Sequence, residues 1–153
     1  MVFKNCEKAV PAEIGTLTEQ DEALLESARG LYNRCAGVVS EQAIQKYSND
    51  LIEMVWNTNK YIDEMAPWVL RKTDTERMAT VLYVIMEVLR HVAILYQPII
   101  PDSANKILDL LAVPEDQRSF EHLTDEFMIQ KGAPITKPKG VFPRIEVEEL
   151  VEA

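Results

Sequence analysis

Apolar residues recur at intervals of three and four along most of the chain, which is the spacing that gathers them on one face of an α-helix. The first such stripe follows Thr18, a good N-cap residue, and Asp21 adds a carboxylate to the first turn. We therefore predict a helix that begins near Glu19. Its buried stripe comprises Leu24, Leu25, Ala28, Leu31, Tyr32, Cys35 and Val39.

A second stripe begins after Ser40, which we expect to cap a helix of about seven turns. Proline disfavours helical geometry in the residue before it, so Pro67 should end this helix, with Met65 as its last full position. We also expect Trp56, inside the helix, to belong to the core. The stripe comprises Ile44, Tyr47, Leu51, Met54 or Val55, Thr58 and Ile62.

The clearest apolar periodicity begins at Thr75, after a polar break over residues 72–74, and reaches Tyr96. This pattern predicts the central and most buried helix of the protein. Its buried positions are Met78, Val81, Leu82, Ile85, Val88, Leu89, Val92, Leu95 and Tyr96.

Prolines mark the next turn of the chain. Pro98 and Pro101 form a rigid corner, and we expect Asp102 to cap a shorter helix that follows it. Further short helical pieces are expected after Pro114. The inward positions of the shorter helix are Ile107, Leu108 and Leu111.

From Gly132 the sequence changes to a stretch rich in proline and glycine and then to alternating valine and glutamate, which predicts an extended C-terminal arm. We therefore divide the chain into a helical domain, residues 1–131, and an extended arm, residues 132–153. The short connections keep sequence neighbours packed together. The predicted fold class is all-α, an antiparallel helical bundle.

Composition agrees with one packed helical domain, since 47% of the 153 residues are hydrophobic and 27% are charged. The formal net charge of −9 is the wrong sign for a protein that binds nucleic acid through its overall charge. RNA can still be recognised through a local patch and through stacking of splayed bases. Any RNA contact must then be small and specific.

The two cysteines, Cys6 and Cys35, have no zinc-ligand spacing and form no disulfide framework, although a single bridge between them is left open. No secretory leader is apparent at the start of the sequence, and no stretch matches the roughly 18 apolar residues of a membrane span. These features favour a cytoplasmic protein that does not enter a membrane.

Catalytic groups are sparse. The two histidines, His91 and His122, fall in the central helix and in a late polar stretch, with no partner in the sequence pattern. Carboxylate pairs such as Asp63 and Glu64 lie on predicted surfaces without a metal-ligand pattern. The sequence contains no phosphate-binding glycine loop. We therefore predict no active site and no metal site in this chain.

A binding role is better supported, and it centres on Trp68, which directly follows the proline at the end of a long helix. A tryptophan face beside cations suits an unstacked base. The pattern alone favours the other interpretation, a hydrophobic lid over the core. The neighbouring cations are Lys60, Arg71, Lys72 and Arg77.

The segment YIDEMAPWVLRK, residues 61–72, resembles a motif of the bacterial methionyl-tRNA synthetase family that marks the end of a long helix in its C-terminal anticodon-binding domain. The resemblance continues through RMATVLYVIMEVLRHVAILYQPIIPDSANKILDLL, residues 77–111, and into GVFPRIE, residues 140–146. Nearly the whole chain is covered.

The resemblance implies a class I helical anticodon-binding bundle that reads the CAU anticodon of methionine tRNA, with Trp68 stacking on the first anticodon base. The family also uses an asparagine and a basic residue of its first helix, and the resemblance implies that this chain begins at the last turn of that helix. Lys4 and Asn5 are therefore candidates for that contact. The full set of candidate tRNA-binding residues is Trp68, Lys60, Arg71, Lys72, Asn59, Lys4 and Asn5.

The family's enzymes attach methionine to tRNA with ATP and magnesium in a catalytic domain that often carries zinc. Because the signatures of that domain are missing here, we expect no cofactor in this chain and no aminoacylation by it alone. The expected partners are methionine tRNA and the catalytic domain of the parent enzyme, with neither DNA nor a membrane. Two other functions remain open: a stand-alone helical tRNA-binding factor and a protein-interaction module.

Overall fold

The computed structural model describes residues 1–142. Over these residues the chain is helical, and the isolated bridge between Ala9 and Pro134 is their one β-type pairing. The α-helices are α1 (Val2–Asn5), α2 (Glu19–Ser40), α3 (Ile44–Met65), α4 (Pro67–Thr73), α5 (Thr75–Tyr96) and α6 (Pro101–Leu110). Three short 3-10 helices follow, Glu115–Gln117, Phe120–His122 and Asp125–Phe127. The predicted all-α class is confirmed.

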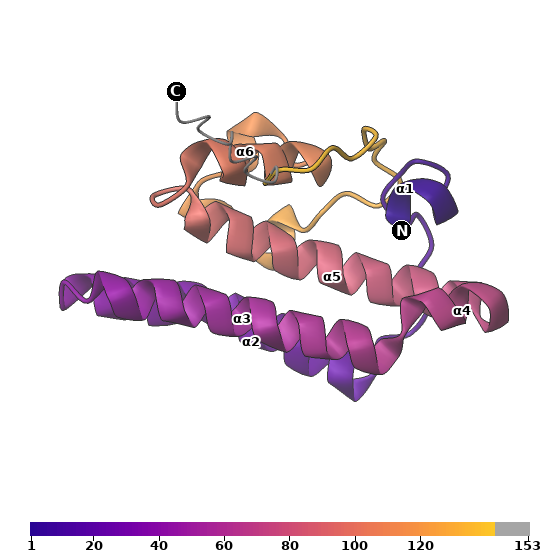
Figure 1. Ribbon diagram of the computed structural model, residues 1–153, viewed down its shortest axis with the longest axis horizontal. Helices are drawn as coiled ribbons and strands as arrows, with labels where there is room; N and C mark the ends of the chain where they lie inside the picture. Colours follow the sequence, from indigo (N-terminus) through magenta and orange to yellow (C-terminus); the bar gives the residue numbers. More distant parts are fainter. Residues whose placement is uncertain (143–153) are drawn as a thin grey trace, which may run out of the picture.

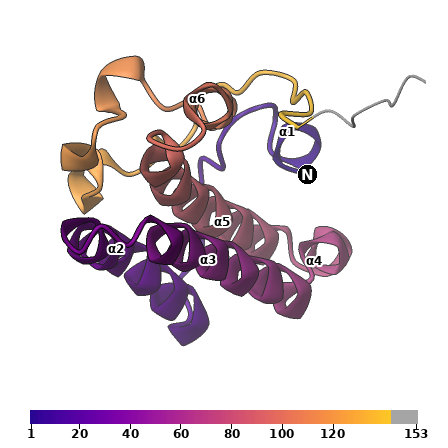
Figure 2. The ribbon, with the colours of Figure 1, turned by 60° about the vertical axis from the view of Figure 1, so that its left-hand side comes forward.

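Helix α5 lies at the centre of the bundle, with α2 and α3 on one side and α6 on the other (Figures 1 and 2). The prediction of a central, most buried helix is confirmed. Helix α5 is also long and apolar enough to match a membrane span, with a mean hydropathy of 1.7 in its most apolar window, which corrects the sequence-based view that no stretch matches one. However, 83% of that window is buried inside the bundle, as expected for the core helix.

The predicted start of α2 is confirmed in detail. The Thr18 backbone N–H donates to Asp21 Oδ2 at 2.8 Å, which forms one half of a capping box. The prediction that Ser40 caps α3 was wrong. Ser40 is the last residue of α2, and its hydroxyl donates to the Ala36 carbonyl at 3.2 Å. Helix α3 begins four residues later, at Ile44, and Ala43 is its N-cap.

The prediction that Trp56 belongs to the core was also wrong, because 68% of its surface is exposed. The buried stripe of α3 passes through Met54 and Thr58, on either side of Trp56 in sequence. Two residues correspond to about 200° around an α-helix. Trp56 therefore points away from the core.

The start of α6 differs from the prediction too. Pro101 is its first residue, Ile100 is its N-cap, and Asp102 lies in its first turn instead of capping it. Proline suits this position because its missing N–H would be unpaired there in any case. Leu108 and Leu111 are buried as predicted, whereas Ile107 is partly buried.

A buried polar cluster on α5 holds the segment that follows α6. Glu87 accepts hydrogen bonds from the Arg90 guanidinium and, at 3.0 Å, from the Ile129 backbone N–H. Arg90 also donates to the His122 carbonyl at 2.6 Å. Burial alone would raise the pKa of Glu87, but hydrogen bonds from His91 and Arg90 outweigh it and lower this pKa. His91 is buried in the cluster as well.

The beginning of the predicted arm is joined to the N-terminal segment. The Gly132 N–H donates to the Val10 carbonyl at 3.1 Å, and the Ile135 N–H donates to the Lys8 carbonyl at 2.9 Å. The rest of the arm, residues 143–153, lies outside the described residues. The division at residue 131 remains a prediction.

Candidate nucleic-acid interface

The corner between α3 and α4 is set by the backbone of Ala66, which has left-handed torsion angles, φ 43° and ψ 59°. Its N–H donates to the Ile62 carbonyl at 2.9 Å, and its own carbonyl accepts from the Val69 N–H at 2.8 Å. Pro67 then occupies the first position of α4, where proline is favoured. The chain therefore changes direction within one residue, and α4 leaves α3 at a fixed corner.

Helix α4 was missed by the sequence analysis, which placed a polar break over residues 72–74. Only Asp74 interrupts the helices, and its carboxylate caps α5 by accepting from the Arg77 N–H at 2.9 Å. The helix positions Trp68 in its first turn, with 48% of the side chain exposed. Because residues three and four apart share one helix face, Trp68 lies on the same face as Arg71 and Lys72.

Arg71 and Lys72 are both exposed, and neither forms an ion pair within residues 1–142. They also lie in the last turn of α4, where cations are favoured by the helix dipole. The face therefore combines an accessible indole ring with two free positive charges. Val69, which the sequence analysis did not single out, adds an apolar side chain that is 51% exposed next to Trp68.

Arg77, the fourth predicted cation, has a structural role instead. It donates to the buried carboxylate of Asp21, with one contact at 2.8 Å, and lies 3.3 Å from the sulfur of Met65 at the end of α3. Asp21 also accepts from the Tyr61 hydroxyl at 2.6 Å. Burial alone would raise the pKa of Asp21, but hydrogen bonds from Arg77, Tyr61 and Thr18 hold it at about 2. This cluster ties α2, α3 and α5 together beside the corner.

Lys60 and Asn59 are exposed near the end of α3. Lys60 Nζ lies 3.8 Å from Glu64 Oε1, and both residues line a groove between α2 and α3. The charge of Lys60 is thus partly matched by a neighbour, unlike the charges of Arg71 and Lys72. Asn59 lies on a more outward face of the helix, because it is three residues from the exposed Trp56.

Lys4 and Asn5 lie on α1, at the same end of the bundle as α4 (Figure 1). Lys4 is exposed. The Asn5 side-chain amide donates to the Met1 carbonyl at 2.8 Å, and Asn5 lines a groove with Thr75 and Glu76 at the start of α5. The structure therefore gathers the candidates of α1 and α4 at one end of α5 (Figure 1).

Two further predictions can be compared with the described residues. Cys6 and Cys35 are both free thiols, so the bridge that the sequence left open is not formed. Burial raises the pKa of Cys35 to about 11, which leaves it a protonated core residue at neutral pH. Within residues 1–142, no group of three or more His, Cys, Asp and Glu side chains is placed to hold a metal ion.

Comparison with known families identifies this architecture. The family model for the anticodon binding domain of methionyl tRNA ligase matches residues 10–153. The bundle is therefore an anticodon-binding domain of the kind found in tRNA ligases. More specifically, the chain belongs to the methionyl-tRNA ligase anticodon-binding family.

Individual relatives agree with this assignment. The methionine–tRNA ligase of Rhizobium meliloti is 45% identical over 149 residues, which cover 97% of this chain and 29% of that protein. The corresponding ligase of Mycobacterium leprae is 40% identical and is matched over 98% of this chain and 28% of its own length. The chain thus spans somewhat under a third of the relatives that it matches.

Solved structures show the same fold. The apo form of Mycobacterium tuberculosis methionyl-tRNA synthetase superposes with a TM-score of 0.91 at 39% identity, covering 97% of this chain and 30% of that one. The same enzyme bound by methionyl-adenylate gives a TM-score of 0.89 at 40% identity and covers 94% and 28% of the two chains.

Proposed function

We propose that this chain reads the CAU anticodon of methionine tRNA and that Trp68 stacks on the first anticodon base. One observation carries the proposal: an exposed tryptophan shares a helix face with Arg71 and Lys72 at a rigid corner. Stacking of one base on an aromatic side chain contributes roughly 1–3 kcal/mol. The two cations would meet the phosphates that flank that base.

A small contact of this kind resolves the conflict with the net charge of −9. Arg71 and Lys72 have no ion-pair partner within residues 1–142, so their charges are available to RNA even though the protein as a whole repels it. Asn59, Lys60, Lys4 and Asn5 are proposed as secondary contacts around the same end of the bundle. Binding should therefore be weak and selective.

We further propose that this domain works as part of a longer methionine–tRNA ligase, whose catalytic domain attaches methionine with ATP and magnesium. The relatives bear that name, and this chain covers 28–30% of their length. Phe142 is 66% exposed and belongs to the segment GVFPRIE, residues 140–146, which resembles the family segment that folds back towards the catalytic domain, so it is a candidate contact for that domain. We place this activity in the cytoplasm.

The test is a titration of the protein with two stem-loops that differ only in the first anticodon base. We expect preferential binding of the CAU stem-loop. We also expect a shallow dependence on salt, since few phosphates are contacted and each contact in a single-stranded loop adds about 0.7 to the steepness of log affinity against log salt. Equal binding of both stem-loops would contradict the reading role.

A further inference from the structure

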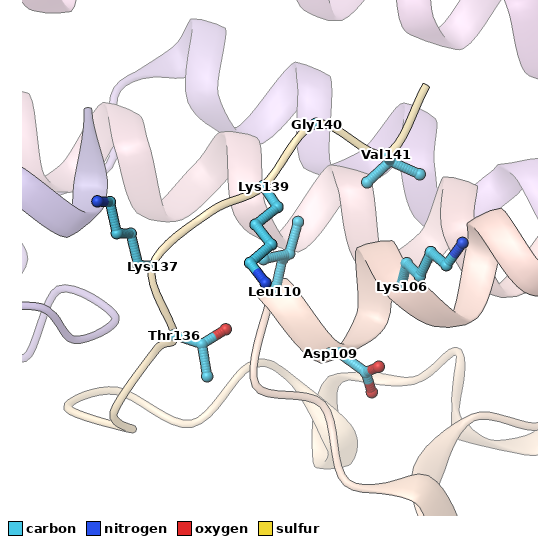
Figure 3. Close-up of a pocket in the computed structure, with 8 residues that line it drawn as sticks. All are labelled: Lys106, Asp109, Leu110, Thr136, Lys137, Lys139, Gly140 and Val141. Atoms are coloured by element: carbon cyan, nitrogen blue, oxygen red, sulfur yellow. The ribbon is translucent and has the colours of Figure 1, made fainter. Parts of the chain in front are cut away.

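A second cationic surface lies away from Trp68, in a groove between α6 and the segment 136–141. The groove has a volume of about 460 Å³, and three of its eight lining residues are lysines: Lys106, Lys137 and Lys139. Figure 3 shows Lys106 on α6 and the other two on the segment that passes over it. Three lysines thus line one groove on a chain whose net charge is −9.

The positive charge of this groove is not cancelled by the described neighbours. Its one acidic lining residue, Asp109, accepts a hydrogen bond from Arg118 at 2.7 Å, so its charge is already matched. None of the three lysines forms an ion pair within the part of the chain that the structure describes. All three are exposed. Among residues 1–142, the three lysines therefore have no anionic partner and can contact a ligand.

The arrangement of the lysines indicates the kind of ligand. In Figure 3 the three side chains are spread along the groove, with Lys139 between the other two, and they do not converge on one point. A single phosphate would need converging donors, whereas a nucleic-acid backbone offers successive charges in a row. Thr136 adds a hydroxyl, which also suits a phosphate or a sugar.

The position of the groove fits a contact with the same RNA. Helix α4 lies at the start of α5, and α6 folds back over the other end of α5 (Figure 1). Each residue advances an α-helix by about 1.5 Å. Because α6 runs back along α5, its last turn lies roughly 15–20 Å along the bundle axis from the level of α4. This separation along the bundle axis is within the length of an RNA stem whose loop lies at Trp68.

We propose that Lys106, Lys137 and Lys139 form a second RNA-binding surface, which contacts the phosphate backbone of the tRNA outside its anticodon. This inference rests on the proposed function of the Trp68 corner, but the two contacts differ in what they do. Base contacts decide which sequence is bound, and phosphate contacts supply affinity that does not depend on sequence. The lysine groove should strengthen binding without changing the preference for CAU.

The experiment compares the full chain with the double variant Lys137→Gln/Lys139→Gln, using full-length methionine tRNA transcripts with the CAU anticodon or with its first base changed. We expect the double variant to bind both transcripts roughly three to ten times more weakly at low salt, and its salt slope to fall by about 2. The ratio of the two affinities should be unchanged. An unchanged affinity and slope would overturn the proposal.

A matched control comes from Lys46, an exposed lysine at the opposite end of α3 from α4. We expect Lys46→Gln to leave tRNA binding unchanged and Lys139→Gln to weaken it; equal effects would mean that only net charge matters and would overturn the proposal. If the wild-type chain shows no preference for CAU, the proposed function fails instead.

Acetylation of lysine amines gives a second readout. Bound tRNA should protect Lys137 and Lys139 from modification. Protection by an acidic peptide and not by tRNA would assign the groove to a protein partner and would overturn the inference.

Discussion

Arg77 donates to both carboxylate oxygens of Asp21, and this ion pair joins the first turn of α5 to the first turn of α2 beside the corner that carries Trp68. The Tyr61 hydroxyl completes the cluster from the last turns of α3. Asp21 is fully buried, whereas the Arg77 side chain is 19% exposed. Three helix ends are thus held together where α4 begins.

The substitution Asp21→Asn should lower the free energy of unfolding by about 2–3 kcal/mol, because it leaves the partly buried Arg77 without its anion. Urea denaturation measures this loss. Tyr61→Phe is the matched control, since it removes one hydrogen bond and should cost only about 1 kcal/mol. A loss below about 0.5 kcal/mol for Asp21→Asn would show that the pair does not stabilise the fold.

The same carboxylate predicts how stability depends on pH. The pKa of Asp21 is about 2 in the folded protein and ordinarily 3.8, so the folded state favours the ionised form. The resulting stabilisation, on the order of 2–3 kcal/mol, is nearly complete above about pH 5 and is lost as the pH falls through 2. The difference in unfolding free energy between wild type and Asp21→Asn should therefore shrink over this range. A constant difference would contradict this assignment.

Glu87→Gln should destabilise the protein by about 3 kcal/mol, since it leaves the buried guanidinium of Arg90 without a negative partner. The exchange of the Ile129 amide proton should also become faster, because this N–H donates to Glu87. The exposed pair of Arg29 and Asp125, 2.8 Å apart, provides the contrast. Asp125→Asn should cost less than about 1 kcal/mol, and a similar loss from both variants would contradict the argument from burial.

Trp56→Ala should change the free energy of unfolding by less than about 0.5 kcal/mol, as is usual for an exposed position. A tryptophan in the core would cost about 3–5 kcal/mol on the same substitution. Thermal denaturation distinguishes the two values. A loss above about 2 kcal/mol would mean that Trp56 is buried after all.

The long helices were predictable from sequence because α2, α3 and α5 each carry a repeating apolar stripe. Trp56 shows the limit of that reasoning. Its residue type suggests burial, but its angle around the helix points it outwards, and the angle is the stronger determinant. The misplaced caps at Ser40 and Asp102 have a similar origin, since Ala43 and Ile100 take the cap positions without a capping side chain.

The candidate site was only partly predictable. Trp68, Arg71 and Lys72 were identified as neighbours in sequence, but their common face depends on α4, which has only 7 residues and too short a pattern to detect. Arg77 resembled the other cations in sequence, although its partner Asp21 lies 56 positions away. Such a long-range pair, like the three lysines of the α6 groove, becomes visible only in the folded chain.

The central claim is that Trp68 reads the first anticodon base, and the most direct test measures the preference for the CAU stem-loop in three proteins. The wild-type chain and Trp56→Ala should prefer CAU to the stem-loop with its first base changed. Trp68→Ala should lose this preference and roughly 1–3 kcal/mol of binding, while its melting temperature stays nearly unchanged. An undiminished preference in Trp68→Ala would contradict the proposal that Trp68 reads the first anticodon base. A large loss of stability would show instead that Trp68 packs over the hydrophobic core.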